Sequence, residues 1–118
     1  MMETISNPLA TATFTWLSPE EGGRKSGPPT APVYVSTCVF PLGGEQQVQP
    51  GWPAEADEMF SILLEEIETV GSPSTRRYNV DFLTPDLVAQ FVQPGAQVIV
   101  LEGPKVVALG QFDEVFNR

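Results

Sequence analysis

PAEADEMFSILLEEIETVG, residues 53–71, decides the fold of this chain, because its apolar residues fit two different secondary structures. In one interpretation the segment is a helix that begins near Pro53 and ends at Gly71. The apolar residues at helical spacing are Phe60, Leu63, Leu64, Ile67 and Val70. In the other interpretation it is a strand. Its two faces are then Phe60, Ile62 and Leu64 on one side, and Met59, Ser61 and Leu63 on the other. Taken alone, the segment favours a helix, so the choice depends on the elements around it.

The segments on either side have the shorter patterns of strands. In residues 11–17, TATFTWL, threonines alternate with apolar residues. Residues 33–40 are rich in β-branched and aromatic side chains. Residues 78–83, YNVDFL, alternate again after a turn-like GSPSTRR. The last two predicted strands, residues 97–102 and 105–112, flank Gly103-Pro104 with the spacing of a hairpin.

One short helical turn is predicted near residues 85–92. Thr84 is a typical N-cap, and Pro85 suits the first position of a helix. Pro94-Gly95 then ends the turn. The helical content outside the segment 53–71 is therefore small.

The length of 118 residues is that of one domain, and we expect a single domain over residues 1–118, with residues 1–10 as a flexible end. Twelve prolines and ten glycines indicate many turns and hence several short strands. The amino-terminal residues lack the pattern of a signal peptide, and no apolar run approaches the ~18 residues of a membrane span. These features predict a cytoplasmic protein with no membrane partner.

Residues suited to catalysis or to metal binding are scarce. The chain has no histidine, which excludes His-based nucleophile pairs and His-based metal sites. Cys38 is the only cysteine and lies in an apolar strand pattern, so we expect a buried thiol and no internal disulfide. The chain also lacks the glycine-rich phosphate-binding motif of nucleotide hydrolases. We therefore predict a noncatalytic protein that uses no cofactor, metal or nucleotide.

The net charge of −9 and the pI near 4.2 make broad affinity for nucleic acids or anionic membranes unfavourable. Between residues 45 and 68 the chain carries acids and no base. These acids are Glu45, Glu55, Asp57, Glu58, Glu65, Glu66 and Glu68. A partner that binds this stretch would be basic. The alternative is a solvated acidic face that only keeps the protein soluble.

The stretch LSPEEGGRKSG, residues 17–27, places Arg24 and Lys25 directly after a glycine pair. Glycines permit close backbone approach, and an arginine beside them can hold a phosphate or a carboxylate. The alternative is a tight turn in which Arg24 pairs with Glu20 or Glu21 at the surface. The local sequence leaves both interpretations open.

LSPEEGGRKSG resembles the start of the third domain of translation elongation factor Tu, and LEGPKVVALGQFDEV, residues 101–115, resembles the last hairpin of that domain. The likeness extends to short bacterial chains that resemble this isolated barrel. It implies a six-stranded antiparallel barrel, in which residues 59–67 form a strand. It also implies that Arg24, Lys25 and Lys105 lie where the family meets the T stem of aminoacyl-tRNA. The family's basic second strand is missing here, because residues 33–40 contain no arginine.

These observations support three hypotheses. In the first, the protein is a noncatalytic protein-binding module that uses Glu65, Glu66, Glu68 and Trp52. Trp52 lies in the loop sequence QPGWPAE, and its alternative role is to plug one end of the barrel. In the second, the protein is a tRNA-binding accessory that acts through Arg24, Lys25 and Lys105. In the third, barrels pair edge to edge as a homo-oligomer.

Overall fold

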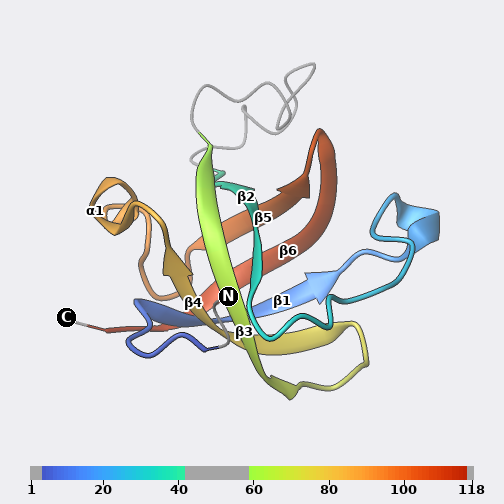
Figure 1. The fold of residues 1–118 in the computed structure, drawn as a ribbon, viewed down its shortest axis with the longest axis horizontal. Coiled ribbons are helices and arrows are strands. Elements are labelled where there is room, and N and C mark those ends of the chain that lie inside the picture. The colour runs from blue at the N-terminus through green and yellow to red at the C-terminus, as the bar shows by residue number, and fades with distance from the viewer. Residues whose placement is uncertain (1–3, 42–58, 117–118) are drawn as a thin grey trace.

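The computed structural model describes residues 4–41 and 59–116. Six antiparallel strands close into a barrel in the order β1-β4-β3-β2-β5-β6 (Figure 1). The strands are β1 (Ala10–Trp16), β2 (Tyr34–Val39), β3 (Phe60–Thr69), β4 (Thr75–Phe82), β5 (Gln97–Glu102) and β6 (Lys105–Val115). The described residues also include a 3-10 turn, η1 (Pro19–Glu21), and a short helix, α1 (Pro85–Val88). The predicted all-β barrel is confirmed.

The segment with two interpretations forms strand β3. Ile62 and Leu64 point into the barrel core, as the strand interpretation requires. Leu63 lies on the opposite face and is also buried, because Ile5 and Val33 pack against it. Burial on both faces explains why the segment has a continuous apolar run instead of a clean alternation.

The end of β3 shows why the helical spacing was misleading. The pairing of β3 with β4 shifts between Glu66 and Glu68, so Ile67 occupies a bulge. Its side chain is 46% exposed, although a helix would have placed it on the same apolar face as Leu64. The bulge therefore leaves the apolar side chain of Ile67 partly exposed to solvent.

Strand β4 begins earlier than the sequence pattern predicts. GSPSTRR was interpreted as a turn, but Thr75, Arg76 and Arg77 already belong to β4. The turn is tighter, and the Val70 amide donates to the Thr75 carbonyl at 2.8 Å. Arg76 and Arg77 therefore lie on the barrel wall, paired with residues of β3.

The predicted helical turn near residues 85–92 is present as α1, followed by a further turn bond from the Phe91 amide to the Val88 carbonyl at 2.8 Å. Thr84 takes the N-cap position, as predicted, but its side chain makes no capping hydrogen bond. Pro85 at the start of the helix therefore contributes more to this boundary than Thr84 does.

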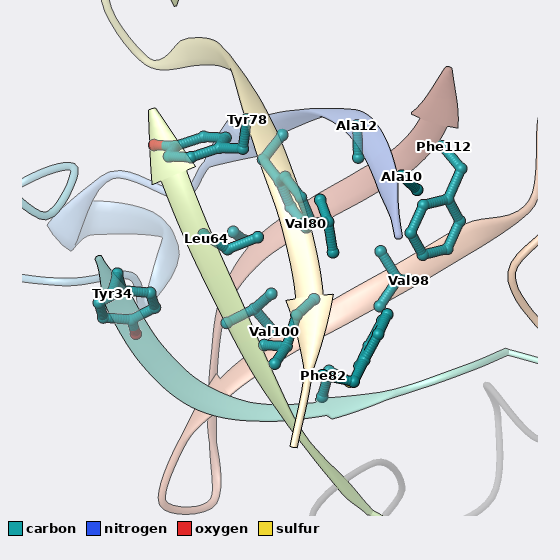
Figure 2. Close-up of a cluster of buried hydrophobic side chains, with 14 of the residues drawn as sticks. Ala10, Ala12, Tyr34, Leu64, Tyr78, Val80, Phe82, Val98, Val100 and Phe112 are labelled. Atoms are coloured by element: carbon teal, nitrogen blue, oxygen red, sulfur yellow. The ribbon is translucent and has the colours of Figure 1, made fainter. Parts of the chain in front are cut away.

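Different aromatic residues fill the two ends of the barrel, and Figure 2 shows Tyr34 and Tyr78 at one end with Phe82 and Phe112 at the other. At the tyrosine end, Trp16 Nε1 donates to the Tyr78 hydroxyl at 2.8 Å. The ring of Trp16 meets Tyr34 edge-on with centroids 5.5 Å apart. The other end is purely apolar, with Phe40 at its centre, stacked on Phe91 at 5.0 Å. The polar atoms of buried Trp16 and Tyr78 are thus paired within the fold.

Closure of the barrel bears on the third hypothesis. Each of the six described strands has a hydrogen-bonded neighbour on both sides. Pairing of barrels edge to edge needs a strand at the edge of an open sheet. The described part of the chain contains no strand at the edge of an open sheet, so the closed barrel does not favour that mode of self-association.

Candidate functional site

The loop that follows β1 lies against the β5–β6 hairpin, at the end of the barrel opposite α1 (Figure 1). Arg24 Nη1 forms an ion pair with Glu102, and Arg24 Nε donates to the Gly27 carbonyl at 2.9 Å. The guanidinium also lies over the Tyr34 ring, 5.4 Å from its centroid. The predicted adjacency of the Gly-Gly-Arg-Lys loop and the last hairpin is therefore present.

The ion pair corrects the alternative interpretation of the loop, in which Arg24 pairs with Glu20 or Glu21. Neither Glu20 nor Glu21 pairs with it among the described residues; the partner is Glu102, brought close by barrel closure. The Glu21 side chain instead accepts from the Ser18 amide at 2.9 Å, in a capping box that orders η1. This hydrogen bond from the Ser18 backbone lowers the pKa of Glu21.

The glycine pair has a structural role in this loop. Gly22 has a φ of 90°, the left-handed conformation that ends η1. A Cβ on Gly23 would lie 1.9 Å from the Leu17 carbonyl oxygen, so a larger residue cannot fit. The geometry of the turn is enough to explain why both residues are glycine. The Arg24 guanidinium is already paired with the Glu102 carboxylate.

Tyr34 joins the same cluster, and its hydroxyl donates to Glu102. Burial, followed by the hydrogen bond to Glu102, raises the pKa of Tyr34 to about 12. Desolvation opposes the charge on Arg24, but its hydrogen bond and Coulomb attraction to Glu102 outweigh that cost and raise the Arg24 pKa. Arg24, Tyr34 and Glu102 therefore form one polar cluster with its charges balanced.

The two lysines of the predicted cation site are more open. Lys25 is exposed in the turn after Arg24, and Lys105 lies across the hairpin from Glu102. Neither forms an ion pair with the residues that the structure describes. The structure thus brings the three predicted cations to one rim, but Glu102, Glu20 and Glu21 offset their charge.

The predicted acidic residues on β3 lie opposite the arginines of β4. Glu66 forms an ion pair with Arg76 at 2.7 Å, and Glu68 forms one with Arg77 at 3.5 Å. Glu65 Oε1 accepts from the Asn79 side chain at 3.1 Å. Residues 45–68 contain no basic residue, but the pairing of β3 with β4 places Arg76 and Arg77 beside these acids.

Two further acids of this surface come from β6 and were not predicted. Arg77 contacts Asp113 at 3.7 Å and Glu114 at 3.3 Å, in addition to Glu68. Asp113 also accepts from the Thr13 hydroxyl at 2.8 Å. Their position depends on how β6 pairs with β1, including a register shift between Thr11 and Ala12 that no local pattern reveals.

We call the surface formed by Glu65, Glu68, Arg77, Asp113 and Glu114 the acidic face. Its members come from β3, β4 and β6. Three of its carboxylates contact the Arg77 guanidinium, and the fourth, Glu65, accepts from Asn79, so the acidic face keeps a net negative charge after its internal pairing. It joins two of the predicted acids, Glu65 and Glu68, to two that the sequence did not indicate, Asp113 and Glu114.

An open hollow of about 430 Å³ lies where β1, β6 and β5 meet. We call it the neutral hollow, because no charged side chain lines it. Its lining residues are Thr13, Thr15, Gln97, Val98, Ile99, Leu109, Gly110 and Gln111. Leu109 is 48% exposed there, which leaves a large apolar side chain open to a ligand.

Trp52 and the acids at positions 45–58 lie outside the described residues. The described residues contain no group of acids and cysteines placed to hold a metal ion. Burial raises the pKa of the Cys38 thiol to about 12, which makes it a poor nucleophile. No helix in the described ranges is long and apolar enough to cross a membrane.

The resemblance to the third domain of elongation factor Tu stays a prediction from two sequence stretches, residues 17–27 and 101–115. A scan against protein-family models finds no matching family, and a search of curated proteins finds no match either.

Proposed function

We propose that this protein is a noncatalytic binding module that engages a basic protein partner through the acidic face. The observation that carries the proposal is the convergence of Glu68, Asp113 and Glu114 on the single guanidinium of Arg77. Carboxylates from two strands that are distant in sequence thereby share one surface with an excess of negative charge. Lysine and arginine side chains of a partner would complement that excess.

The competing explanation is a solvated acidic face that only keeps the protein soluble. The two explanations differ in whether the position of the charges matters. For solubility, neutralising any two exposed acids has the same effect, because only the net charge changes. For binding, the effect is confined to the acidic face.

A matched pair of variants separates these explanations. Glu68→Gln with Glu114→Gln neutralises two exposed members of the acidic face. Glu20→Gln with Asp86→Asn neutralises two exposed acids elsewhere and changes the net charge equally. Cross-linked complexes from a lysate of the source organism are quantified by mass spectrometry for wild type and both variants.

We expect a basic protein to be captured by wild type and by the Glu20/Asp86 variant, and to be lost with the Glu68/Glu114 variant. Capture should also weaken as salt is raised, because exposed charge pairs are screened. Equal capture by both variants would reject the acidic face as the binding surface.

The tRNA-binding accessory remains our alternative proposal. It depends on Lys25 and Lys105, which have no ion pair among the described residues, since Arg24 is held by Glu102. So few free cations predict weak binding with a shallow salt dependence. A titration of the protein with tRNA at about 50 mM salt tests it, and a flat titration removes it. The kinship with elongation factor Tu and a cytoplasmic location likewise remain proposals from the sequence.

A further inference from the structure

The neutral hollow and the acidic face are continuous on the barrel wall. Pairing across the strands aligns Thr13 with Gln111 and Gln97 in one row, and Thr15 with Leu109 and Ile99 in the next. The first row continues in the other direction from Thr13 to Arg77 on β4 and Glu68 on β3. A ligand that lies along this row would therefore touch both surfaces.

Thr13 is the residue that joins them. It lines the neutral hollow, and its hydroxyl donates to Asp113 of the acidic face at 2.8 Å. Asp113 lies at the register shift of β6, two residues after Gln111, and the hydrogen bond from Thr13 places its carboxylate beside the hollow. The hollow and the nearest carboxylate are thus held in a fixed relation by paired strands.

The hollow is suited to an uncharged side chain. Its exposed apolar group is Leu109, and Ile99 lies beside it in the same cross-strand row. Gln111 Nε2 donates to the Gly95 carbonyl at 3.2 Å, and the Gln97 amide group and Gln111 Oε1 can form hydrogen bonds with a peptide backbone. Its volume of about 430 Å³ is ample for one large side chain.

We propose that the neutral hollow holds one large apolar side chain of a peptide segment whose neighbouring lysines or arginines lie on the acidic face. This inference rests on the proposed function, because the same basic partner supplies both groups. The apolar side chain in the hollow fixes the position of the peptide along the barrel wall. Charge attraction alone steers a partner to the surface but does little to fix that position. Burial of one large apolar side chain supplies the specific contact.

The test uses the full chain and a display library of random nonapeptides as the probe. Selection on wild type should enrich peptides that combine at least two basic residues with one large apolar residue. Selection on Leu109→Ser should enrich basic peptides without an apolar preference. Val35→Ser is the matched control, because Val35 is 54% exposed on β2 and lies outside the hollow.

The best peptide is then synthesised and titrated by fluorescence anisotropy. We expect at least tenfold weaker binding to Leu109→Ser, and unchanged binding to Val35→Ser. Circular dichroism melting checks that both variants fold. Amide shifts in NMR spectra should be centred on Thr13, Leu109 and Gln111.

The outcomes separate this inference from the proposed function. If wild type enriches basic peptides with no apolar preference, the acidic face binds and the hollow does not, so the inference alone fails. If apolar peptides without basic residues are enriched, the link between hollow and acidic face is wrong. If no peptide is enriched, the inference is rejected, and the lysate experiment decides the function by itself.

Discussion

Arg24 and Glu102 are 78 positions apart in the sequence, and their side chains form an ion pair that ties the loop after β1 to the last hairpin. The contact exists only because the barrel closes, with β1 beside β6. Glu102 also accepts from Tyr34 on β2, so one carboxylate joins three parts of the chain. This cluster occupies the arginine that would otherwise be the strongest candidate for binding an anion.

Removal of Arg24 should therefore lower stability. We expect Arg24→Ala to reduce the free energy of unfolding by about 1–2 kcal/mol, since the pair is partly exposed but has charge-assisted hydrogen bonds. Urea denaturation measures the change, and a double-mutant cycle with Glu102→Ala isolates the pair. Lys25→Ala is the control and should have little effect. Equal losses for Arg24→Ala and Lys25→Ala would contradict the assigned role of the pair.

The two tyrosines predict an alkaline loss of stability. Burial is the largest cause that raises the pKa of both Tyr34 and Tyr78 from 10.0 to about 12. Below pH 10 both the folded and the unfolded chain keep the phenol protons. Between pH 10 and 12 the unfolded chain releases them first, so the free energy of unfolding falls as pH rises, by about 1.4 kcal/mol per unit of pKa difference at full effect.

Tyrosinate absorbance gives a direct measurement, because Tyr34 and Tyr78 are the only tyrosines of the chain. The folded protein should show its absorbance transition near pH 12, and the urea-unfolded chain near pH 10. Tyr34→Phe and Tyr78→Phe should each remove half of the absorbance change. A transition of the folded protein at the ordinary tyrosine pKa would show that these hydroxyls are not buried.

Gly110 is predicted to be intolerant of a side chain. A Cβ at this position would lie 2.3 Å from Cε2 of the fully buried Phe14 ring. We expect Gly110→Ala to destabilise the fold by about 1–3 kcal/mol through overpacking. Thermal melting tests this, with Gln111→Ala as a neighbouring exposed control. The cost of Phe14→Leu should be smaller in the Gly110→Ala background than in wild type, and equal costs would exclude the steric explanation.

Arg77 is expected to stabilise the fold in a salt-dependent way. It is the only base in the acidic face, so Arg77→Gln leaves Glu68, Asp113 and Glu114 to repel one another. We expect a loss of about 1 kcal/mol at low salt and a smaller loss at about 1 M salt, where exposed charges are screened. Urea denaturation at both salt concentrations gives the comparison. Lys105→Gln, which removes a cation outside the acidic face, is the control, and a salt-independent loss for Arg77→Gln would point to packing instead.

The sequence predicted the strands whose alternation is local, and missed the features that depend on pairing between distant strands. Residues 11–17 alternate because the apolar side of β1 faces the core, whereas the threonine side runs from buried Thr11 to exposed Thr15. Asp113 and Glu114 gave no signal, because they reach Arg77 only where β1 pairs with β6 on one side and with β4 on the other. For the same reason, the surface-turn interpretation of Arg24 named only its sequence neighbours Glu20 and Glu21, and not Glu102. The acids on β3 were found, but their arginine partners were placed in a turn.

The segment around Leu64 and Ile67 offers the sharpest experimental distinction between the two folds that its sequence allows. In a helix these residues, three positions apart, would share one apolar face and would cost similar amounts to truncate. In the barrel Leu64 is 1% exposed, whereas Ile67 is 46% exposed at the bulge. We therefore expect Leu64→Ala to cost about 2–5 kcal/mol and Ile67→Ala less than about 0.5 kcal/mol.

Denaturant unfolding measures both, with Leu63→Ala as a third point: its contacts with Ile5 and Val33 predict a substantial cost in the barrel. Similar costs for Leu64→Ala and Ile67→Ala would contradict strand β3, and the acidic face would lose the strand that carries Glu65 and Glu68.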